Sequence, residues 1–146
     1  MKWNELENES CPIARALSVI GDRWTLLIIR DCFMGVTRFD QLQRNIGMTR
    51  HVLADRLKKL VEADVLEKRP YQERPVRYEY LLTRKGASFF PVLMMLFSWS
   101  EKHLPHDQVA PYEFLNAETG HKIEPVLYDD KTGSKVDGRN IIRKEN

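Results

Sequence analysis

A cysteine directly before a proline is the residue of this chain best placed for covalent chemistry. Cys11 precedes Pro12, and the apolar residues that follow recur at helical spacing, so we expect a helix to begin at Pro12. The dipole and the free backbone N–H groups at the start of a helix favour the thiolate form of a cysteine. Cys11 is therefore a predicted redox-sensing thiol, and a small, buried and inert side chain is the alternative. The other cysteine, Cys32, lies in an apolar segment and is expected to pack.

Other side chains suited to catalysis or metal binding lack the partners that this chemistry needs. His103 and His106 are close in sequence, but no acidic or thiol residue lies at ligand spacing from them, and the two cysteines lack the C-x-x-C spacing of a zinc site. The chain has no glycine-rich phosphate loop and no hydrolase motif. A thiol peroxidase built on Cys11 would lack a general base or a resolving cysteine nearby in the sequence. We therefore predict no catalytic residue, no metal, no cofactor and no enzymatic activity.

Positive charge is concentrated in the middle of the chain. The 146 residues carry a net charge of only +2, from 23 Lys and Arg against 21 Asp and Glu. Residues 23–85 hold 14 basic and 8 acidic side chains, a net charge of +6, whereas residues 1–22 and 86–146 carry −2 each. A basic block of this size attracts polyanions, although an ordinary solvated surface can have the same composition. Only a recognisable binding motif distinguishes a polyanion-binding surface from an ordinary solvated one.

Two helices are expected ahead of the basic motif. The first begins at Pro12 and ends at Gly21. Asp22 is a favourable N-cap for the second, Arg23–Phe33, and Gly35 ends it. The centre of this second helix is apolar nearly all round, so we expect it in the middle of a small domain.

A helix-turn-helix is predicted next. After a short extended piece at Thr37–Phe39, we expect a short helix over Asp40–Asn45 and a tight turn at Gly47-Met48. Thr49 then caps a longer amphipathic helix that runs to about Ala63. In this motif the N-terminal residues of the second helix enter the major groove of DNA. A plain amphipathic helix with a solvated charged face is the alternative.

A basic hairpin follows. Leu66–Tyr71 and Val76–Leu82 have the length and composition of strands, and Gln72–Pro75 is a polar turn between them. A hairpin after a helix-turn-helix makes a winged helix. The wing can lie along the phosphate backbone or reach the minor groove.

The next predicted helix is too apolar to face solvent on all sides. It covers Arg84–His103, with Thr83 as its cap, Pro91 as a kink or interruption and Pro105 as its end. We expect part of its surface to pack against a second subunit, and burial within one domain is the alternative. The predicted interface comprises Phe89, Phe90, Leu93, Leu96, Phe97 and Trp99.

The fold class that follows is α+β and mostly helical: a winged helix-turn-helix with a C-terminal dimerisation helix and a small β-hairpin-like tail. We divide the chain into an arm (1–10), the DNA-binding and dimerisation domain (11–104) and an extension (105–146). The tail hairpin is expected from the turns at Thr119-Gly120 and Thr132-Gly133. No signal peptide is apparent, and the longest apolar stretch is about half of a membrane span, so we expect a cytoplasmic, nucleoid-associated protein with no membrane partner.

The predicted partner is double-stranded DNA, and its contacts divide by role. Arg50 and His51, at the start of the second helix of the motif, are expected to contact base edges. Thr49 is either a contact or only the cap. Asp55 and Lys58 face the same way and are expected to reach bases or phosphates.

The remaining basic side chains are expected to contact phosphates. Such contacts raise the affinity for DNA without contributing sequence specificity. Arg56 lies nearer the helix flank, where an intramolecular ion pair explains it as well as the DNA-binding role that the family resemblance given below favours. The phosphate contacts are predicted to be Arg38, Lys59, Lys68, Arg74 and Arg77.

Several of these segments together resemble the HxlR-type bacterial transcriptional regulators. The resemblance begins at Cys11-Pro12-Ile13 and at Gly21-Asp22-Arg23-Trp24, and it continues through Arg38-Phe39 and the helix after Thr49 to Trp99. It also includes the end of the wing, Arg77-x-Glu79-Tyr80-x-Leu82-Thr83-x-x-Gly86. It implies a winged-helix homodimer, related to the MarR-like regulators, that binds an operator with two-fold symmetry.

The resemblance also bears on the signal and on the tail. Some HxlR-type members use the cysteine that matches Cys11 to sense electrophiles or oxidants, and many have the cysteine with no such role. Some carry a zinc-ribbon-like extension; here Thr119-Gly120 and Asp129-x-x-Thr132-Gly133 keep the glycines without the thiols, which implies a metal-free hairpin.

Three alternatives to an electrophile-responsive, DNA-binding regulator remain open. The first is a regulator of the same fold that responds to a small ligand and has an inert Cys11. The second is a winged helix that binds only proteins, since the fold alone does not decide function. The third is RNA binding, for which the expected stacking aromatic residues on a sheet are missing.

Overall fold

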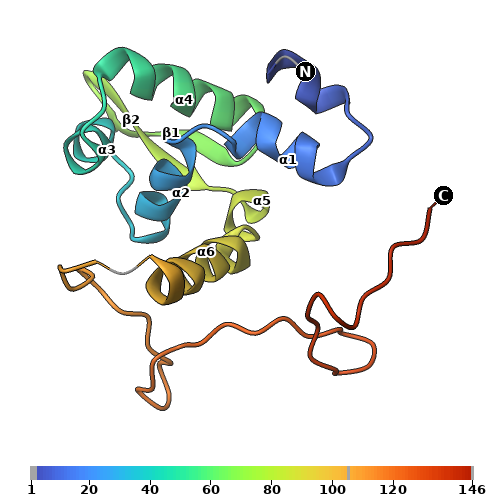
Figure 1. Cartoon of the computed structure of the whole chain (residues 1–146). Coiled ribbons are helices and arrows are strands. Elements are labelled where there is room, and N and C mark those ends of the chain that lie inside the picture. Colours follow the sequence, from blue (N-terminus) through green and yellow to red (C-terminus); the bar gives the residue numbers. More distant parts are fainter. Residues whose placement is uncertain (1–2, 105, 146) are drawn as a thin grey trace. The chain divides into compact units, whose positions relative to one another are not determined.

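The structure is a computed structural model that describes residues 3–104 and 106–145. The chain forms two compact units, Met1–Leu93 and Met94–Asn146, and the boundary falls inside helix α6 (Phe90–His103). The first unit is a winged helix-turn-helix, which confirms the predicted fold class (Figure 1). Its elements in chain order are η1 (Trp3–Asn8), α1 (Pro12–Ile20), α2 (Thr25–Phe33), α3 (Phe39–Ile46), α4 (Arg50–Glu62), β1 (Leu66–Glu73), β2 (Val76–Leu82) and α5 (Arg84–Ala87).

Helix α2 begins later than we predicted. Pro12 opens α1 and Gly21 ends it, as expected. Regular helix in α2 starts only at Thr25, not at Arg23. The carboxylate of Asp22 accepts hydrogen bonds from the backbone N–H groups of Trp24 and Thr25, at 2.9 and 3.2 Å. Asp22 does cap the segment, but it draws Arg23 and Trp24 into a turn around its carboxylate instead of into the helix.

The helix-turn-helix forms as its turn residues predict. Helix α3 ends at Gly47, whose φ of +74° is a conformation that glycine adopts without strain. The hydroxyl of Thr49 accepts a hydrogen bond from the N–H of Val52 at 3.4 Å and so caps α4. Helix α3 includes Phe39, so it is slightly longer than predicted.

The wing is an antiparallel pair of strands. Leu66 pairs with Leu82 at its base and Glu73 with Val76 at its tip, and the register shifts between Pro70 and Gln72. The predicted extended piece before α3 does not stand alone. Arg38 forms a bridge to Glu79 of β2, so this piece lies along the wing.

One hydrophobic core holds α2, α3, α4 and the base of the wing together. The apolar face predicted for α4 is confirmed, because Leu53, Leu57 and Leu60 are at most 1% exposed. Helix α5 closes the base of the wing, where a Cβ atom on Gly86 would lie only 2.1 Å from the carbonyl oxygen of Val65. The other members of the core are Ile28, Ile29, Cys32, Leu42, Met48, Val65 and Leu66.

The predicted helix Arg84–His103 is interrupted, as Pro91 indicated. Helix α5 ends at Ala87 and α6 begins at Phe90, which places Pro91 in the first turn of α6. A proline is tolerated there because the first backbone N–H groups of a helix have no partner within the helix. Helix α6 ends at His103, and Pro105, its predicted end, lies outside the described residues.

The hairpin-like tail takes the form of two similar turns in the second unit. One bridge joins Leu115 to Lys122 and another joins Tyr128 to Lys135. Each turn contains a glycine with positive φ, Gly120 and Gly133. None of the described helices is long and apolar enough to cross a membrane. The predicted division of the chain at residues 11 and 105 stays a prediction.

Candidate nucleic-acid interface

The first turn of α4 presents exposed polar and basic side chains. Thr49, Arg50 and His51 are all exposed. The guanidinium of Arg50 lies 4.7 Å from the centre of the Phe39 ring and 3.5 Å from a carboxylate oxygen of Asp40. Both members of this ion pair are more than 70% exposed, so the pair contributes little stability and can exchange for another partner. Thr49 serves as the cap, and its predicted contact role stays untested.

Further along α4, the predicted contact residues form ion pairs along the helix. Lys59 lies 3.2 Å from Asp55 and Lys58 lies 3.8 Å from Glu62, both one helical turn apart. These are exposed pairs that leave the lysine charges accessible. Arg56 instead turns away from solvent, as described below.

A groove of about 480 Å³ lies between α3, the start of α4 and the wing. We call it the wing groove. One carboxylate, that of Asp40, lies in it among five cations, so its potential is positive. The cations are Arg38, Arg44, Arg50, Lys68 and Arg77.

Aromatic rings contact three of these cations: Phe39 lies under Arg50, and two tyrosines of the wing lie under the other two. The guanidinium of Arg38 lies 4.3 Å from the centre of the Tyr71 ring, and the ammonium of Lys68 lies 4.3 Å from that of Tyr78. Tyr71 falls at the register shift of the wing. Sequence reasoning missed Arg44 and both tyrosines as members of this site. For Arg44, its positive charge was the only sequence signal that could have identified it. For Tyr71, nothing in the sequence predicts the register shift at which it lies.

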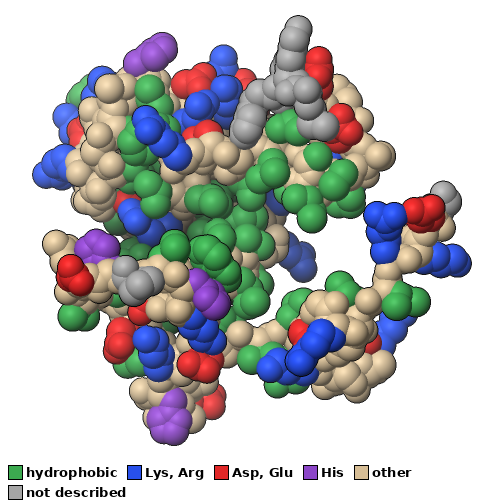
Figure 2. Space-filling model, viewed as in Figure 1, with side chains coloured by type: hydrophobic (Ala, Val, Ile, Leu, Met, Phe, Trp, Pro, Cys, Tyr) green, Lys and Arg blue, Asp and Glu red, His purple; other side chains and the backbone are tan. Residues whose placement is uncertain are grey.

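The wing tip carries further exposed cations. Arg74 and Arg77 are both exposed, and the side chain of Gln72 closes the tip by donating to the carbonyl oxygens of Arg74 and Pro75. Arg69 is paired with Glu79 at 3.1 Å. Figure 2 shows Lys and Arg side chains over α3, the start of α4 and the wing, at the upper left of the view. The structure thus brings four of the predicted basic residues together in the wing groove, Arg38, Arg50, Lys68 and Arg77. Arg56 and Lys59 instead line a cavity on another flank of α4.

The two cysteines have contrasting environments. Cys11 is exposed and occupies the N-cap position of α1. The guanidinium of Arg15 donates to the carbonyl oxygens of Glu9 and Ser10, directly before Cys11. Cys32 is buried in the core, and burial together with the charge of Asp31 raises its pKa to about 12. Cys32 is therefore a packing residue, as predicted, and its thiol is unreactive at neutral pH.

The predicted interface residues of the long helix fall into two groups. Phe89 and Leu93 pack against the core, and Phe97 contacts Tyr112 and Phe114, with ring centres 5.9 and 5.0 Å apart. The remaining three are exposed: Phe90, Leu96 and Trp99.

Two further apolar side chains, missed by sequence reasoning, are exposed on α6. Val92 and Met95 join Leu96 and Trp99 at the spacing of a single helical stripe. Helix α1 also has no buried residue, and its Ile13 and Leu17 are 71% and 42% exposed. Hydrophobic side chains over α1 face solvent in Figure 2.

Comparison with known proteins finds a helix-turn-helix family. The family described as HxlR-like helix-turn-helix matches residues 19–108. The chain is 38% identical over 138 residues to the uncharacterized HTH-type transcriptional regulator Rv3095 of Mycobacterium tuberculosis, covering 94% of this chain and 86% of that one. It is also 34% identical over 109 residues to the HTH-type transcriptional regulator YodB of Bacillus subtilis, covering 73% of this chain and 97% of YodB.

Solved structures show the same architecture. The crystal structure of PA1607 is similar with a TM-score of 0.85 at 33% identity, and covers 96% of this chain and 98% of that one. The diamide-treated form of YodB has a TM-score of 0.53 at 33% identity, covering 64% of this chain and 94% of that one.

Proposed function

The chain belongs to the HxlR-like helix-turn-helix family of transcriptional regulators, and from this premise we propose that two copies of it bind a two-fold symmetric DNA operator. The observation that carries the proposal is the common orientation of the α4 N-terminus and the wing groove, which both present cations on one side of the first unit. Such a surface matches the phosphate backbone on either side of a major groove. The protein acts on cytoplasmic DNA and catalyses no reaction.

Helix α4 is the recognition helix in this proposal. Its first turn enters the major groove, where Arg50 donates two hydrogen bonds to a guanine and His51 contacts a neighbouring base edge. The exposed pair of Arg50 with Asp40 is given up on binding at little cost. Lys58 and Lys59 lie further along the helix and contact phosphates or outer bases. Asp55 remains paired with Lys59.

The wing groove holds the phosphate backbone. Arg38, Lys68 and Arg77 line it and Arg74 extends from the tip, so these cations contact phosphates and supply affinity for any sequence. Arg44 joins them as a contact that the structure adds.

The aromatic rings of the wing groove contribute by restricting cation mobility. We expect Tyr71→Leu to weaken DNA binding about two- to fivefold, because Arg38 loses the ring that holds it. The charge of the protein does not change, so the slope of log Kd against log salt should stay the same. Fluorescence anisotropy at several salt concentrations measures both quantities. Tyr71→Phe keeps the ring and should bind as the unmodified protein does; equal loss in both variants would show that the hydroxyl, not the ring, matters.

The second copy is proposed to pack against exposed apolar side chains. The stripe of Val92, Met95, Leu96 and Trp99 on α6 would cost free energy in water, and so would the exposed face of α1. Two-fold symmetric packing buries the same patch on both copies.

Selection of duplexes from a random library tests the proposed function. The recovered sequences should form an inverted repeat whose half-sites are about one helical turn of 10 base pairs apart, because a symmetric dimer presents two recognition helices on one side of the DNA. Recovery of no common sequence would contradict the proposal and favour a winged helix that binds only proteins.

A response to electrophiles or oxidants through Cys11 is the proposed signal. The exposure of Cys11 at the start of α1 supports this, and the related YodB has been crystallised after treatment with the thiol oxidant diamide. Because α1 also carries an exposed apolar face, modification of Cys11 would change the surface proposed to meet the second copy. A ligand that binds elsewhere, with an inert Cys11, is the alternative.

Cys11→Ser should abolish the response to thiol-reactive compounds. We expect diamide or a quinone to weaken operator binding of the unmodified protein, and to leave the binding of Cys11→Ser unchanged. Cys32→Ala is the matched control and should respond as the unmodified protein does, since Cys32 is buried and its pKa is about 12. The test measures operator affinity before and after treatment. If the treatment weakens operator binding of Cys11→Ser as it does that of the unmodified protein, Cys11 is not the sensor.

A further inference from the structure

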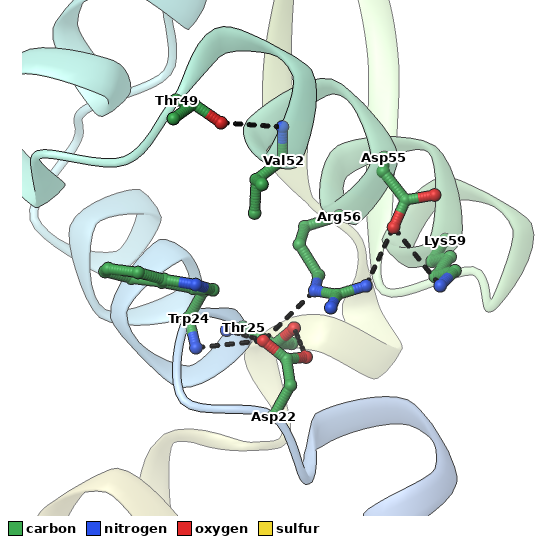
Figure 3. A network of polar contacts seen from close by, with 8 residues as sticks. All are labelled: Asp22, Trp24, Thr25, Thr49, Val52, Asp55, Arg56 and Lys59. Atoms are coloured by element: carbon green, nitrogen blue, oxygen red, sulfur yellow. Dashed lines mark hydrogen bonds and ion pairs between the residues drawn. The ribbon is translucent and has the colours of Figure 1, made fainter. Parts of the chain in front are cut away.

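Charged side chains link the loop before α2 to the middle of α4 (Figure 3). The carboxylate of Asp22 accepts the backbone N–H groups of Trp24 and Thr25 and also the hydroxyl of Thr25. Its Oδ1 atom lies 3.1 Å from Nε of Arg56. One carboxylate therefore fixes the start of α2 and contacts the recognition helix.

Arg56 differs from the cations on the exposed face of α4. Its side chain is 24% exposed, against 73% for Arg50 and 75% for Lys58. Its Nε atom is buried beside Asp22, and its Nη1 atom donates to Asp55 at 2.7 Å. Two carboxylates thus balance the guanidinium, so little of its charge is available to a phosphate.

The ion pair lies on one flank of α4, beside an open cavity. A cavity of about 390 Å³ opens on this flank of the helix, with Asp22, Arg56 and Lys59 in its wall. On the core side, Leu53 and Leu57 are fully buried. These apolar contacts hold one face of α4 in the core. The ion pair between Asp22 and Arg56 adds a second attachment, which ties the flank of α4 to the start of α2.

The carboxylate of Asp22 is charged under the conditions of DNA binding. Partial burial would raise its pKa, but the hydrogen bonds from Thr25 and Trp24 and the charge of Arg56 outweigh it and lower the pKa below its ordinary value. The ion pair is therefore present throughout the neutral pH range.

We propose that Asp22 and Arg56 are positioning residues, which set the orientation of α4 so that its first turn enters the major groove, and that neither side chain touches DNA. This inference rests on the proposed function and assigns a role to two residues outside the DNA-contacting surface. It decides between the two explanations of Arg56 that the sequence leaves open.

Asp22→Asn is the decisive variant. An asparagine oxygen still accepts the N–H groups of Trp24 and Thr25, so the cap of α2 remains while the charge that faces Arg56 is removed. If Arg56 positions α4, affinity for the selected operator falls about tenfold. If Arg56 contacts phosphate, removing a nearby acid raises affinity. The two roles thus predict opposite signs, and an unchanged or raised affinity overturns the inference.

Three further measurements distinguish this loss of operator affinity from a general structural defect of the Asp22→Asn variant. Affinity for a scrambled duplex and the thermal midpoint of Asp22→Asn should stay near those of the unmodified protein, because only the orientation of α4 has changed. Glu62→Gln is the matched control: it removes an acid of α4 that has only an exposed pair with Lys58, and operator binding should not fall. A tenfold loss for the scrambled duplex as well would overturn the inference.

Variants of Arg56 complete the test. Arg56→Met should lose about as much operator affinity as Asp22→Asn, and the double variant should lose no more than either single variant, because both remove the same interaction. The salt slope should be unchanged, whereas removal of a cation that neutralises a phosphate would make it shallower. If Arg56→Met does not fold, Arg56→Lys replaces it, with partial recovery expected. Failure of the unmodified protein to select any operator would instead contradict the proposed function.

Discussion

Replacing Leu96 with aspartate is expected to separate the proposed dimer into monomers and to lower operator affinity about 100-fold or more. Leu96 is 45% exposed on α6, between Met95 and Trp99 on the same apolar stripe. A carboxylate buried in a symmetric interface would lie among apolar side chains without a partner for its charge, and the symmetry repeats this cost on both copies. A monomer holds a single half-site and loses the gain in affinity that linked binding provides.

Sedimentation equilibrium and operator binding together measure this effect. Val109→Asp is the matched control, because it adds the same charge at an apolar side chain that is 93% exposed outside α6. That variant should stay dimeric and bind normally. If Leu96→Asp also remains a dimer with full operator affinity, the two copies do not meet through this stripe.

Arg50→Ala is expected to lower affinity for the operator about 10- to 100-fold and to relax the preference for one base pair in each half-site. A side chain that makes two hydrogen bonds to a guanine contributes about 1–3 kcal/mol of discrimination. Arg50 is exposed in the first turn of α4, where its surface ion pair with Asp40 and its contact with the Phe39 ring leave its guanidinium accessible for such a contact. Competition binding against single-base variants of the operator measures both effects.

Lys68→Ala provides the contrast for Arg50. Lys68 lies in the wing groove over Tyr78, where we propose a phosphate contact. Its removal should weaken binding to the operator and to scrambled DNA by similar factors, and the salt slope should become shallower by about one for each phosphate that is no longer neutralised. If Arg50→Ala shows this same pattern, Arg50 contacts the DNA backbone, and another residue of α4 determines the base specificity.

Local signals predicted most of the elements that form this site. Pro12, Gly47 and Thr49 act locally, through a fixed φ, a positive φ and a side-chain cap respectively, so the helix boundaries next to them could be predicted. The apolar helix is also interrupted next to Pro91, although the break lies between Ala87 and Phe90 and Pro91 itself stands in the first turn of α6.

The parts that the sequence did not predict depend on residues that meet only in the folded chain. The late start of α2 follows from the hydrogen bonds of one carboxylate, and the partner of that carboxylate, Arg56, lies two helices further on. Tyr71 reaches Arg38 because of a register shift in the wing. The exposed stripe of α6 could be anticipated as apolar, but which of its residues remain uncovered depends on packing against the core.

The salt dependence of operator binding tests the central claim most directly. If two copies each place the cations of the wing groove and of α4 against phosphates, the slope of log affinity against log salt should be about −5 or steeper, because each neutralised phosphate releases counterions. A slope of about −1 or shallower for the dimer would contradict the account, since the basic surface could then not lie along the DNA backbone.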